Sequence, residues 1–385
     1  MKYSSVCLGF YFFYGFFIVL NKVLKVSYIS PNYIFPLLII FLLKKGIFYK
    51  KSIISFLFII LIIILNIIFS LDYISVYYFD LVEIIGFCLF PCLLSSSKFN
   101  FNFFIKVLNK MAMANIIIII IYLILNKNDF LQQTEGTLTY MSIGYFLLPS
   151  ILIGVYYSLF YKKNIFEYIF ILIALFLNFL YGSRFSFILG YIGVLILLYL
   201  YNKKFLYYIF FNIAIIINFK KFLELLISSL DKLRINAINV ERIYYSLYLS
   251  KDLNTSSAGR LEIYLDTLQI IKNNIFGIGI YGYLEKMPEY SFGFYPHNIF
   301  LEILLQFGIF GFIIFIFLTF FILVNIAKIK ERKIKIFMIV LLILDSSLLI
   351  SGSYLKNIYF WMTLFFIFNK SLKRIGDEKE KCYKI

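Results

Sequence analysis

Long blocks of apolar residues alternate with short polar segments along the whole chain. The blocks are about 16 to 22 residues long, and a helix of that length crosses the ~30 Å hydrocarbon core of a bilayer at 1.5 Å per residue. Hydrophobic residues make up 62% of the 385 positions and charged residues only 15%, which is far from the composition of a soluble domain. The sequence therefore predicts an all-α, polytopic integral membrane protein.

About twelve blocks have the length of a transmembrane helix. Nine of them fall within residues 1–219 and three within residues 297–369, and one large polar loop at 220–296 separates the two groups. Residues 370–385 form a basic tail. The predicted spans are residues 5–20, 28–43, 52–70, 74–94, 103–125, 138–160, 165–181, 185–201, 205–219, 297–325, 334–352 and 354–369.

The distribution of basic residues predicts the orientation of these spans. With the amino terminus inside, the cytoplasmic segments and the adjoining ends of their spans hold 23 Lys and Arg residues, whereas the short outside segments and their adjoining span ends hold five. The positive-inside rule favours this arrangement over its inverse. We therefore expect cytoplasmic N- and C-termini and an extracytoplasmic loop at 220–296. The net charge of +17 then reflects topology, and no nucleic-acid partner is expected.

Within the loop, one stretch has the apolar spacing of an amphipathic helix. Leu261, Leu265 and Leu268 recur at helical intervals after Gly259-Arg260. The pattern stops at Asn273-Asn274, and the glycines that follow it are typical of a turn. We expect a helix over this stretch, close to the membrane surface.

His297 is the only histidine of the chain and stands at the start of the tenth predicted span. Its unperturbed pKa of about 6.5 allows proton transfer near neutral pH. Pro296 is expected in the first turn of this helix. At 100° per residue, Gly308 and Gly311 then fall on the same helix face as His297. Small residues on one face predict close packing of a neighbouring helix. Without a second histidine or a carboxylate cluster, neither a metal nor another cofactor is expected.

Three segments resemble the bacterial O-antigen polymerase and O-antigen ligase family. The first segment resembles the family's H-N-x9-G-x-x-G signature: His297-Asn298 is followed, after nine residues, by Gly308-Ile309-Phe310-Gly311. Gly259-Arg260-Leu261 with the later Gly277-Ile278-Gly279 is similar to the segment before that histidine, and Gly182-Ser183-Arg184 to a Ser-Arg turn between two earlier spans. The chain departs from the family at Asn274-Ile275, where a proline is common.

The resemblance implies a metal-independent enzyme that transfers glycan from an undecaprenyl-pyrophosphate carrier at the outer face of the bacterial inner (cytoplasmic) membrane. It gives His297 the role of general base, while Arg184 and Arg260 would bind the pyrophosphate, as paired guanidinium N–H groups do. Arg242 and Arg234 are weaker candidates that would widen the phosphate-binding patch. The implied partners are the undecaprenyl-pyrophosphate-linked oligosaccharide, the lipid bilayer, and a chain-length regulator or a lipid A-core acceptor.

Among the activities of this family, we predict a polymerase of polysaccharide repeat units for O-antigen or capsule. The alternative is a ligase that transfers finished glycan to lipid A-core, because both reactions use the same carrier and leaving group. A polysaccharide flippase or other transporter is a further alternative. Transporters usually have two similar halves with binding groups near mid-membrane, whereas these candidate residues gather at one surface.

Simpler roles remain open for each candidate residue. His297 could be an ordinary residue at the start of a helix, and Arg184 could snorkel to the lipid head groups. Arg260 could pair with an acidic neighbour as a solvated loop charge. The roles of three intramembrane carboxylates also stay open, since such groups either line a polar cavity or take up protons. These carboxylates belong to Asp80, Glu83 and Asp345.

Overall fold

The computed structural model describes residues 2–25, 50–67, 84–89, 92–126, 138–202, 219–232, 238–249, 259–287, 295–367 and 369. All regular structure within these residues is helical, which confirms the predicted all-α class. The chain divides into two compact units. Unit 1 combines Met1–Phe12, Asn32–Phe101 and Leu253–Ile385, and unit 2 combines Phe13–Pro31 and Asn102–Asp252.

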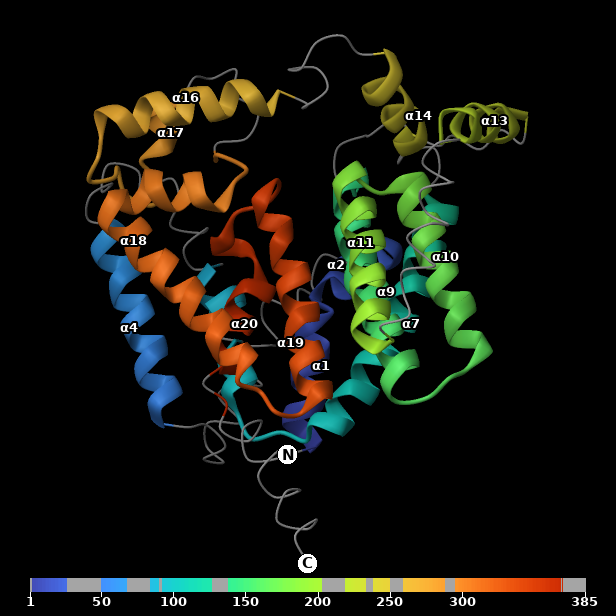
Figure 1. The fold of residues 1–385 in the computed structure, drawn as a ribbon, viewed down its shortest axis with the longest axis horizontal. Helices are drawn as coiled ribbons and strands as arrows, with labels where there is room; N and C mark the ends of the chain where they lie inside the picture. Colours follow the sequence, from blue (N-terminus) through green and yellow to red (C-terminus); the bar gives the residue numbers. More distant parts are fainter. Residues whose placement is uncertain are drawn as a thin grey trace, which may run out of the picture. The chain divides into compact units, whose positions relative to one another are not determined.

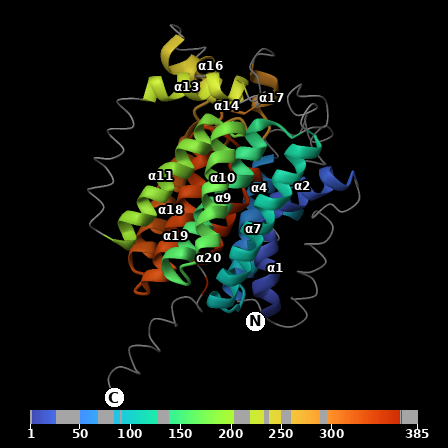
Figure 2. The same cartoon turned by 90° about the vertical axis from the view of Figure 1, so that its right-hand side faces the viewer.

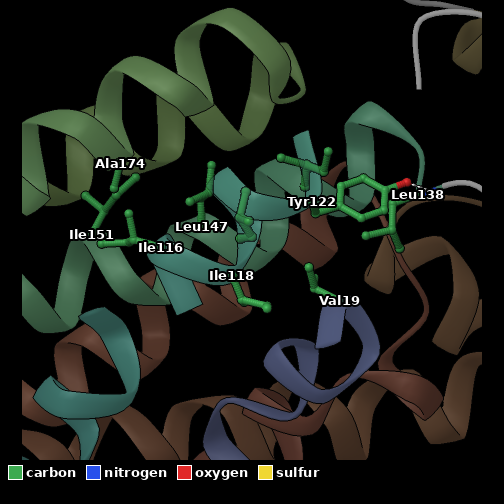
Figure 3. Packing of buried hydrophobic residues seen from close by; sticks show 10 residues of the cluster. Val19, Ile116, Ile118, Tyr122, Leu138, Leu147, Ile151 and Ala174 are labelled. Carbon is green, nitrogen blue, oxygen red and sulfur yellow. Dashed lines mark hydrogen bonds between the residues drawn. The ribbon is translucent and has the colours of Figure 1, made fainter. Parts of the chain in front are cut away.

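Unit 2 is built on a bundle in which α9 packs against both α10 and α11 (Figures 1 and 2). Apolar side chains from α2, α7, α9 and α10 fill its centre, and Figure 3 shows Val19, Ile116 and Ala174 among them. Burial of this surface stabilises the bundle through the hydrophobic effect. The bundle helices are α2 (Tyr14–Leu24), α7 (Phe101–Leu125), α9 (Tyr140–Phe160), α10 (Ile165–Tyr181) and α11 (Arg184–Tyr201).

A second, smaller cluster closes the end of unit 2 at which α10 ends and α11 begins. It is formed by α13 (Phe219–Lys232) and α14 (Ile238–Tyr244), the latter continued by a π-helical turn, η5 (Tyr245–Leu249). Leu223 and Leu230 of α13 and Ile243 of α14 are buried there together with Phe179 and Leu180 of α10. Part of the predicted loop 220–296 is thus helical and docked on the bundle.

Unit 1 contains the carboxy-terminal helices and two amino-terminal segments. Within it, α16 lies across the beginning of α18, and α19 packs against α20 (Figure 1). The α-helices are α1 (Lys2–Phe12), α4 (Lys50–Ile67), α16 (Arg260–Asn273), α17 (Tyr283–Lys286), α18 (Ile299–Ala327), α19 (Arg332–Asp345) and α20 (Ile358–Ile367). The shorter helical segments are η2 (Ile84–Leu89), η3 (Leu93–Ser96), η6 (Ser346–Leu349) and η7 (Tyr354–Lys356).

Four described helices are long and apolar enough to cross a membrane, or five if α1 and α2 form one broken span. The four are α7, Met141–Phe160 of α9, α11 and α18. Three shorter apolar helices, Ser52–Ile67, Ile165–Tyr181 and Ile358–Ile367, also coincide with predicted spans. The predicted spans 28–43 and 205–219, most of 74–94 and the tail 370–385 lie outside the described residues. The total of twelve therefore stays a prediction.

The prediction of one regular helix from His297 through Gly311 is wrong. Helix α18 begins at Ile299, two residues after His297, and it is kinked at Gly308, whose φ of 65° and ψ of −166° are not helical. Counting 100° per residue across this break has no meaning, so the shared face predicted for His297, Gly308 and Gly311 does not exist.

The partner that approaches Gly308 closely is a loop and not the expected neighbouring helix. The segment 275–279, which follows α16, inserts at the break and exchanges backbone hydrogen bonds with α18. Ile278 N donates to Leu305 O (2.9 Å), Gly279 N to Gln306 O (3.1 Å), and Ile309 N to Ile275 O (3.0 Å). The loop thus satisfies helix groups that the kink leaves without intrahelical partners.

Candidate active site

His297 lies at the entry to α18 in an unusual backbone conformation. Its φ is 52°, one of two positive values among the described non-glycine residues. Left-handed backbone is costly for a residue with a Cβ atom, and such conformations cluster at functional sites. The imidazole is half-buried and lies against the ring of Tyr295, with 4.2 Å between ring centroids. The structure thus holds this side chain in a defined position.

Asn298 fixes the start of α18 immediately after His297. Its Oδ1 accepts hydrogen bonds from Phe300 N (3.0 Å) and Leu301 N (3.2 Å), as an N-cap residue does. Its Nδ2 donates to Leu349 O at 3.0 Å. Asn298 therefore joins the first turn of α18 to the segment that follows α19.

Arg260 opens α16, directly after Gly259 with a φ of 76°. Tyr264, one turn further along α16, connects this end of the helix to the His297 segment. Burial raises the pKa of the Tyr264 hydroxyl, while the Arg260 guanidinium and a hydrogen bond with the Asn298 side chain act in the opposite direction. Arg260 and Asn298 thus both act on one hydroxyl, and Asn298 directly follows His297 in the chain.

Behind this group, Glu302 anchors the first turns of α18 in the interior of unit 1. The side chain is fully buried, and Ser353 Oγ donates to its Oε1. Tyr354 N and Gln306 Nε2 also donate to the carboxyl group, each at 3.4 Å, and the Tyr354 hydroxyl donates to Gln306 Oε1 at 2.7 Å. Glu302 faces this polar network, so it acts as a structural anchor and not as a surface charge.

Arg184 is the first residue of α11 and follows a tightly packed turn. The Ser183 hydroxyl caps the helix by accepting from Ser186 N (3.1 Å), and Ser186 Oγ donates to Asn178 Oδ1 (2.8 Å). A Cβ atom at Gly182 would lie 2.0 Å from Asn178 Oδ1, and one at Gly144 only 2.2 Å from Ser186 Oγ. Glycine is therefore required at both positions, and the turn presents Arg184 in a fixed place.

Arg242 lies on α14, which docks at the same end of unit 2. Asn239 of α14 donates from Nδ2 to Phe179 O at 2.9 Å, in the last turn of α10, and helix α14 also contacts α11. Arg184 and Arg242 thus both belong to the end of unit 2 at which α10 turns into α11. Arg234 lies outside the described residues.

Comparison with known proteins gives one match. Residues 169–316 match the family model of O-antigen ligase. This segment runs from α10 into α18 and contains Arg184, Arg242, Arg260 and His297. No curated protein and no solved structure matches the chain.

The match confirms the resemblance to the O-antigen ligase and polymerase family. The resemblance implies a membrane protein that transfers glycan, with lipid-linked glycan as its class of substrate. It does not distinguish a polymerase from an O-antigen ligase.

The structure groups the predicted site residues in two sets. Arg260 and His297 both belong to unit 1, and Arg184 and Arg242 belong to one end of unit 2. Sequence reasoning missed Tyr264 and Asn239. Tyr264 follows Arg260 by four residues, a helical spacing that could have indicated it, whereas nothing in the local sequence of Asn239 signals its contact with α10.

Of the three intramembrane carboxylates singled out in the sequence, the structure describes that of Asp345. Asp345 ends α19, and its Oδ2 accepts a hydrogen bond from Thr363 Oγ1 of α20 at 2.6 Å. This contact links two helices that pack together. Asp80 and Glu83 lie outside the residues that the structure describes.

Proposed function

We propose that this protein polymerises undecaprenyl-pyrophosphate-linked polysaccharide repeat units, for O-antigen or capsule, at the outer face of the bacterial inner membrane. The observation that carries the proposal is the group formed by Arg260, Tyr264, Asn298 and His297 in unit 1. The start of α16 supplies a guanidinium and a phenol, and the start of α18 supplies a backbone-fixed amide and an imidazole. We also propose that the N- and C-termini lie in the cytoplasm and that residues 220–296 lie on the outer side of the membrane.

In the proposed reaction, a hydroxyl of the acceptor sugar attacks the anomeric carbon of the donor glycan. Its oxygen forms the new glycosidic bond while the bond between that carbon and the carrier phosphate oxygen breaks. His297 accepts the hydroxyl proton. The carrier pyrophosphate leaves with the electron pair of the broken bond, and Arg260 and Arg184 stabilise its growing negative charge, with Arg242 and Arg234 in a supporting role.

The family description favours a second candidate, an O-antigen ligase that transfers the glycan to lipid A-core. Donor, leaving group and proposed residue roles are the same in both reactions. Only the acceptor differs. A chain-length regulator would be a further partner of the polymerase but not of the ligase.

A transfer assay tests the proposal. Protein in liposomes receives a synthetic polyprenyl-pyrophosphate oligosaccharide, and products are separated after incubation with and without lipid A-core. A ladder of longer lipid-linked glycans supports the polymerase, and glycan on lipid A-core supports the ligase. His297→Ala, Arg260→Ala and Arg184→Ala are each expected to lower transfer at least about 100-fold.

Lys272→Ala is the matched control, because it removes an exposed cation from the opposite end of α16. It should leave transfer unchanged. Arg260→Lys keeps the charge but loses the bidentate geometry, so it should recover only part of the activity. Full activity of His297→Ala would remove the proposed base. Movement of intact lipid-linked oligosaccharide across the bilayer without any new glycosidic bond would instead identify a flippase.

A further inference from the structure

We infer that Asn239 is a positioning residue that sets the place of Arg242 beside the turn carrying Arg184. What this placement achieves rests on the proposed function, in which both guanidiniums bind the carrier pyrophosphate. The contact itself is a feature of unit 2 alone.

The Asn239 side chain is 1% exposed and reaches the carboxy-terminal turn of α10. Its Nδ2 donates to Phe179 O at 2.9 Å and to Asn178 O at 3.4 Å. The last carbonyls of a helix have no intrahelical donor. Phe179 O is such a carbonyl, because the chain leaves helical geometry at Gly182, and Asn239 caps it from another helix.

Asn178 of α10, whose carbonyl accepts from Asn239, also organises the turn before Arg184. Asn178 O accepts from Gly182 N at 2.9 Å, and Asn178 Oδ1 accepts from Ser186 Oγ at 2.8 Å. One buried asparagine thus contacts the turn before α11 through its side chain and α14 through its backbone carbonyl. Asn239, Asn178 and Ser186 form a continuous buried clasp between the two arginine-bearing segments.

Helix α14 is seven residues long, is continued by η5, and packs against α10, α11 and α13. Ile243 and Val240 pack against the apolar end of α10, but apolar packing is not directional. The hydrogen bonds of Asn239 are directional and select one rotation. Arg242 follows Asn239 by three residues, about 60° away around the helix, so that rotation also fixes where the guanidinium leaves α14.

This placement matters because pyrophosphate recognition by two guanidiniums depends on geometry. Paired N–H contacts need both groups at fixed positions, and small displacements of binding groups cost large factors in rate. Asn239 itself touches protein carbonyls and not the reacting groups. Its effect on transfer is therefore predicted to pass through Arg242.

Spin-label distance measurements test the clasp without reference to activity. Labels replace Glu241 on the exposed side of α14 and Tyr199 on α11, both in unit 2, in a Cys382→Ser background. We expect a narrow distance distribution in the parent protein and a broad one with Asn239→Ala. Asn239→Asp, equal in size but without the donor, should also broaden it. A narrow distribution in both variants would overturn the inference.

Asn115→Ala is the matched control. Asn115 is equally buried in unit 2 and also donates two hydrogen bonds, to Phe146 O (2.7 Å) and Ser150 Oγ (2.9 Å), but it lies on α7 and both of its acceptors lie on α9. The loss of a buried amide there should leave the distance distribution narrow. Broadening in Asn115→Ala equal to that in Asn239→Ala would show general loosening of unit 2 and would also contradict the inference.

The kinetic part uses a double-mutant cycle in the transfer assay. Asn239→Ala should lower transfer about tenfold, and adding Arg242→Ala should cause little further loss, because the guanidinium is already displaced. If the fold-loss in transfer rate of the double variant equals the product of the two single losses, the residues act independently and the link to Arg242 is refuted. If the parent protein transfers no glycan at all, the proposed function fails, while the spin-label result still decides whether Asn239 holds α14.

Discussion

Gly277 and Gly308 lie backbone against backbone where the loop after α16 enters the kink of α18. A Cβ atom at Gly277 would lie 2.6 Å from Gly308 N, and one at Gly308 would lie 2.3 Å from the carbonyl carbon of Phe276. Both glycines also have positive φ values, 90° and 65°. Neither side of this contact has room for a side chain, which explains why glycine stands at both positions.

Gly308→Ala should therefore strongly destabilise unit 1. The variant combines a steric clash with backbone atoms and a left-handed φ, and we expect a loss of more than about 2 kcal/mol in the free energy of unfolding. Trp361, the only tryptophan and a buried residue of α20, reports unfolding in detergent by its fluorescence. Gly86→Ala, where no atom lies within 4 Å of the added Cβ, is the control and should unfold like the parent.

Asn298 should show separable effects of its two polar atoms. Asn298→Ala removes the N-cap and should lower stability by about 1 kcal/mol. Asn298→Asp keeps an oxygen that accepts from Phe300 N and Leu301 N, but it loses the donor to Leu349 O. The stability of this variant should therefore fall between those of the parent protein and Asn298→Ala. Thermal unfolding of the three proteins gives the order. Equal stability of the Ala variant and the parent would contradict the cap.

Glu302→Ala should be among the most damaging substitutions in unit 1. It leaves the buried donors of Ser353, Tyr354 and Gln306 without their acceptor, at a cost of about 1–3 kcal/mol for each unsatisfied group. Glu302→Gln retains one acceptor oxygen and should be milder. Removal of the exposed carboxylate in Glu262→Ala is the comparison, and it should change the unfolding temperature little. A stable Glu302→Ala protein would argue against the anchoring role.

Gly144→Ala should lower glycan transfer although residue 144 lies on a different helix from Arg184. The added Cβ would lie 2.2 Å from Ser186 Oγ and 2.7 Å from Ser183 N, so the turn before Arg184 must shift. We expect a loss of about tenfold or more in transfer rate. Gly190→Ala meets its nearest atom, Leu148 Cδ1, only at 3.3 Å and should remain active. Equal activity of the two variants would mean that the position of the turn is unimportant.

The orientation of the chain can be checked by cysteine labelling of intact cells. In a Cys382→Ser background, Lys272→Cys on α16 should react with a membrane-impermeant maleimide, whereas Lys163→Cys between α9 and α10 should react only after permeabilisation. Both lysines are exposed, so access depends on the side of the membrane. The reverse pattern would invert the proposed topology.

Sequence periodicity predicted individual helices well. Residues 165–181 were predicted as a span and form α10, and the amphipathic stretch that follows Gly259 forms α16 with its end at Asn273. Such elements follow from local patterns of apolar residues and from glycine and asparagine at their ends. The same local rules could have identified Asn298 as the N-cap of α18, because it precedes a long apolar run, but the prediction wrongly placed Pro296 in the first helical turn.

Features that depend on contacts between distant segments could not be predicted in this way. The kink at Gly308 exists because residues 275–279 supply the missing hydrogen bonds, and a periodicity that assumes a continuous helix cannot reveal it. The contact of Asn239 with Phe179 O joins residues 60 positions apart. The predicted convergence of Arg184, Arg260 and His297 on one cavity stays a prediction.

The kink at Gly308 separates α18 into a segment that holds the site residues and a segment long enough to cross the bilayer. Residues 309–327 alone extend about 28 Å at 1.5 Å per residue, close to the thickness of a hydrocarbon core. The turns before the kink are therefore not needed to cross the bilayer and are held by Asn298 and Glu302 instead. When lipid composition changes the bilayer thickness, residues 309–327 can tilt to match it. The kink allows this tilt without moving the His297 imidazole away from Tyr295.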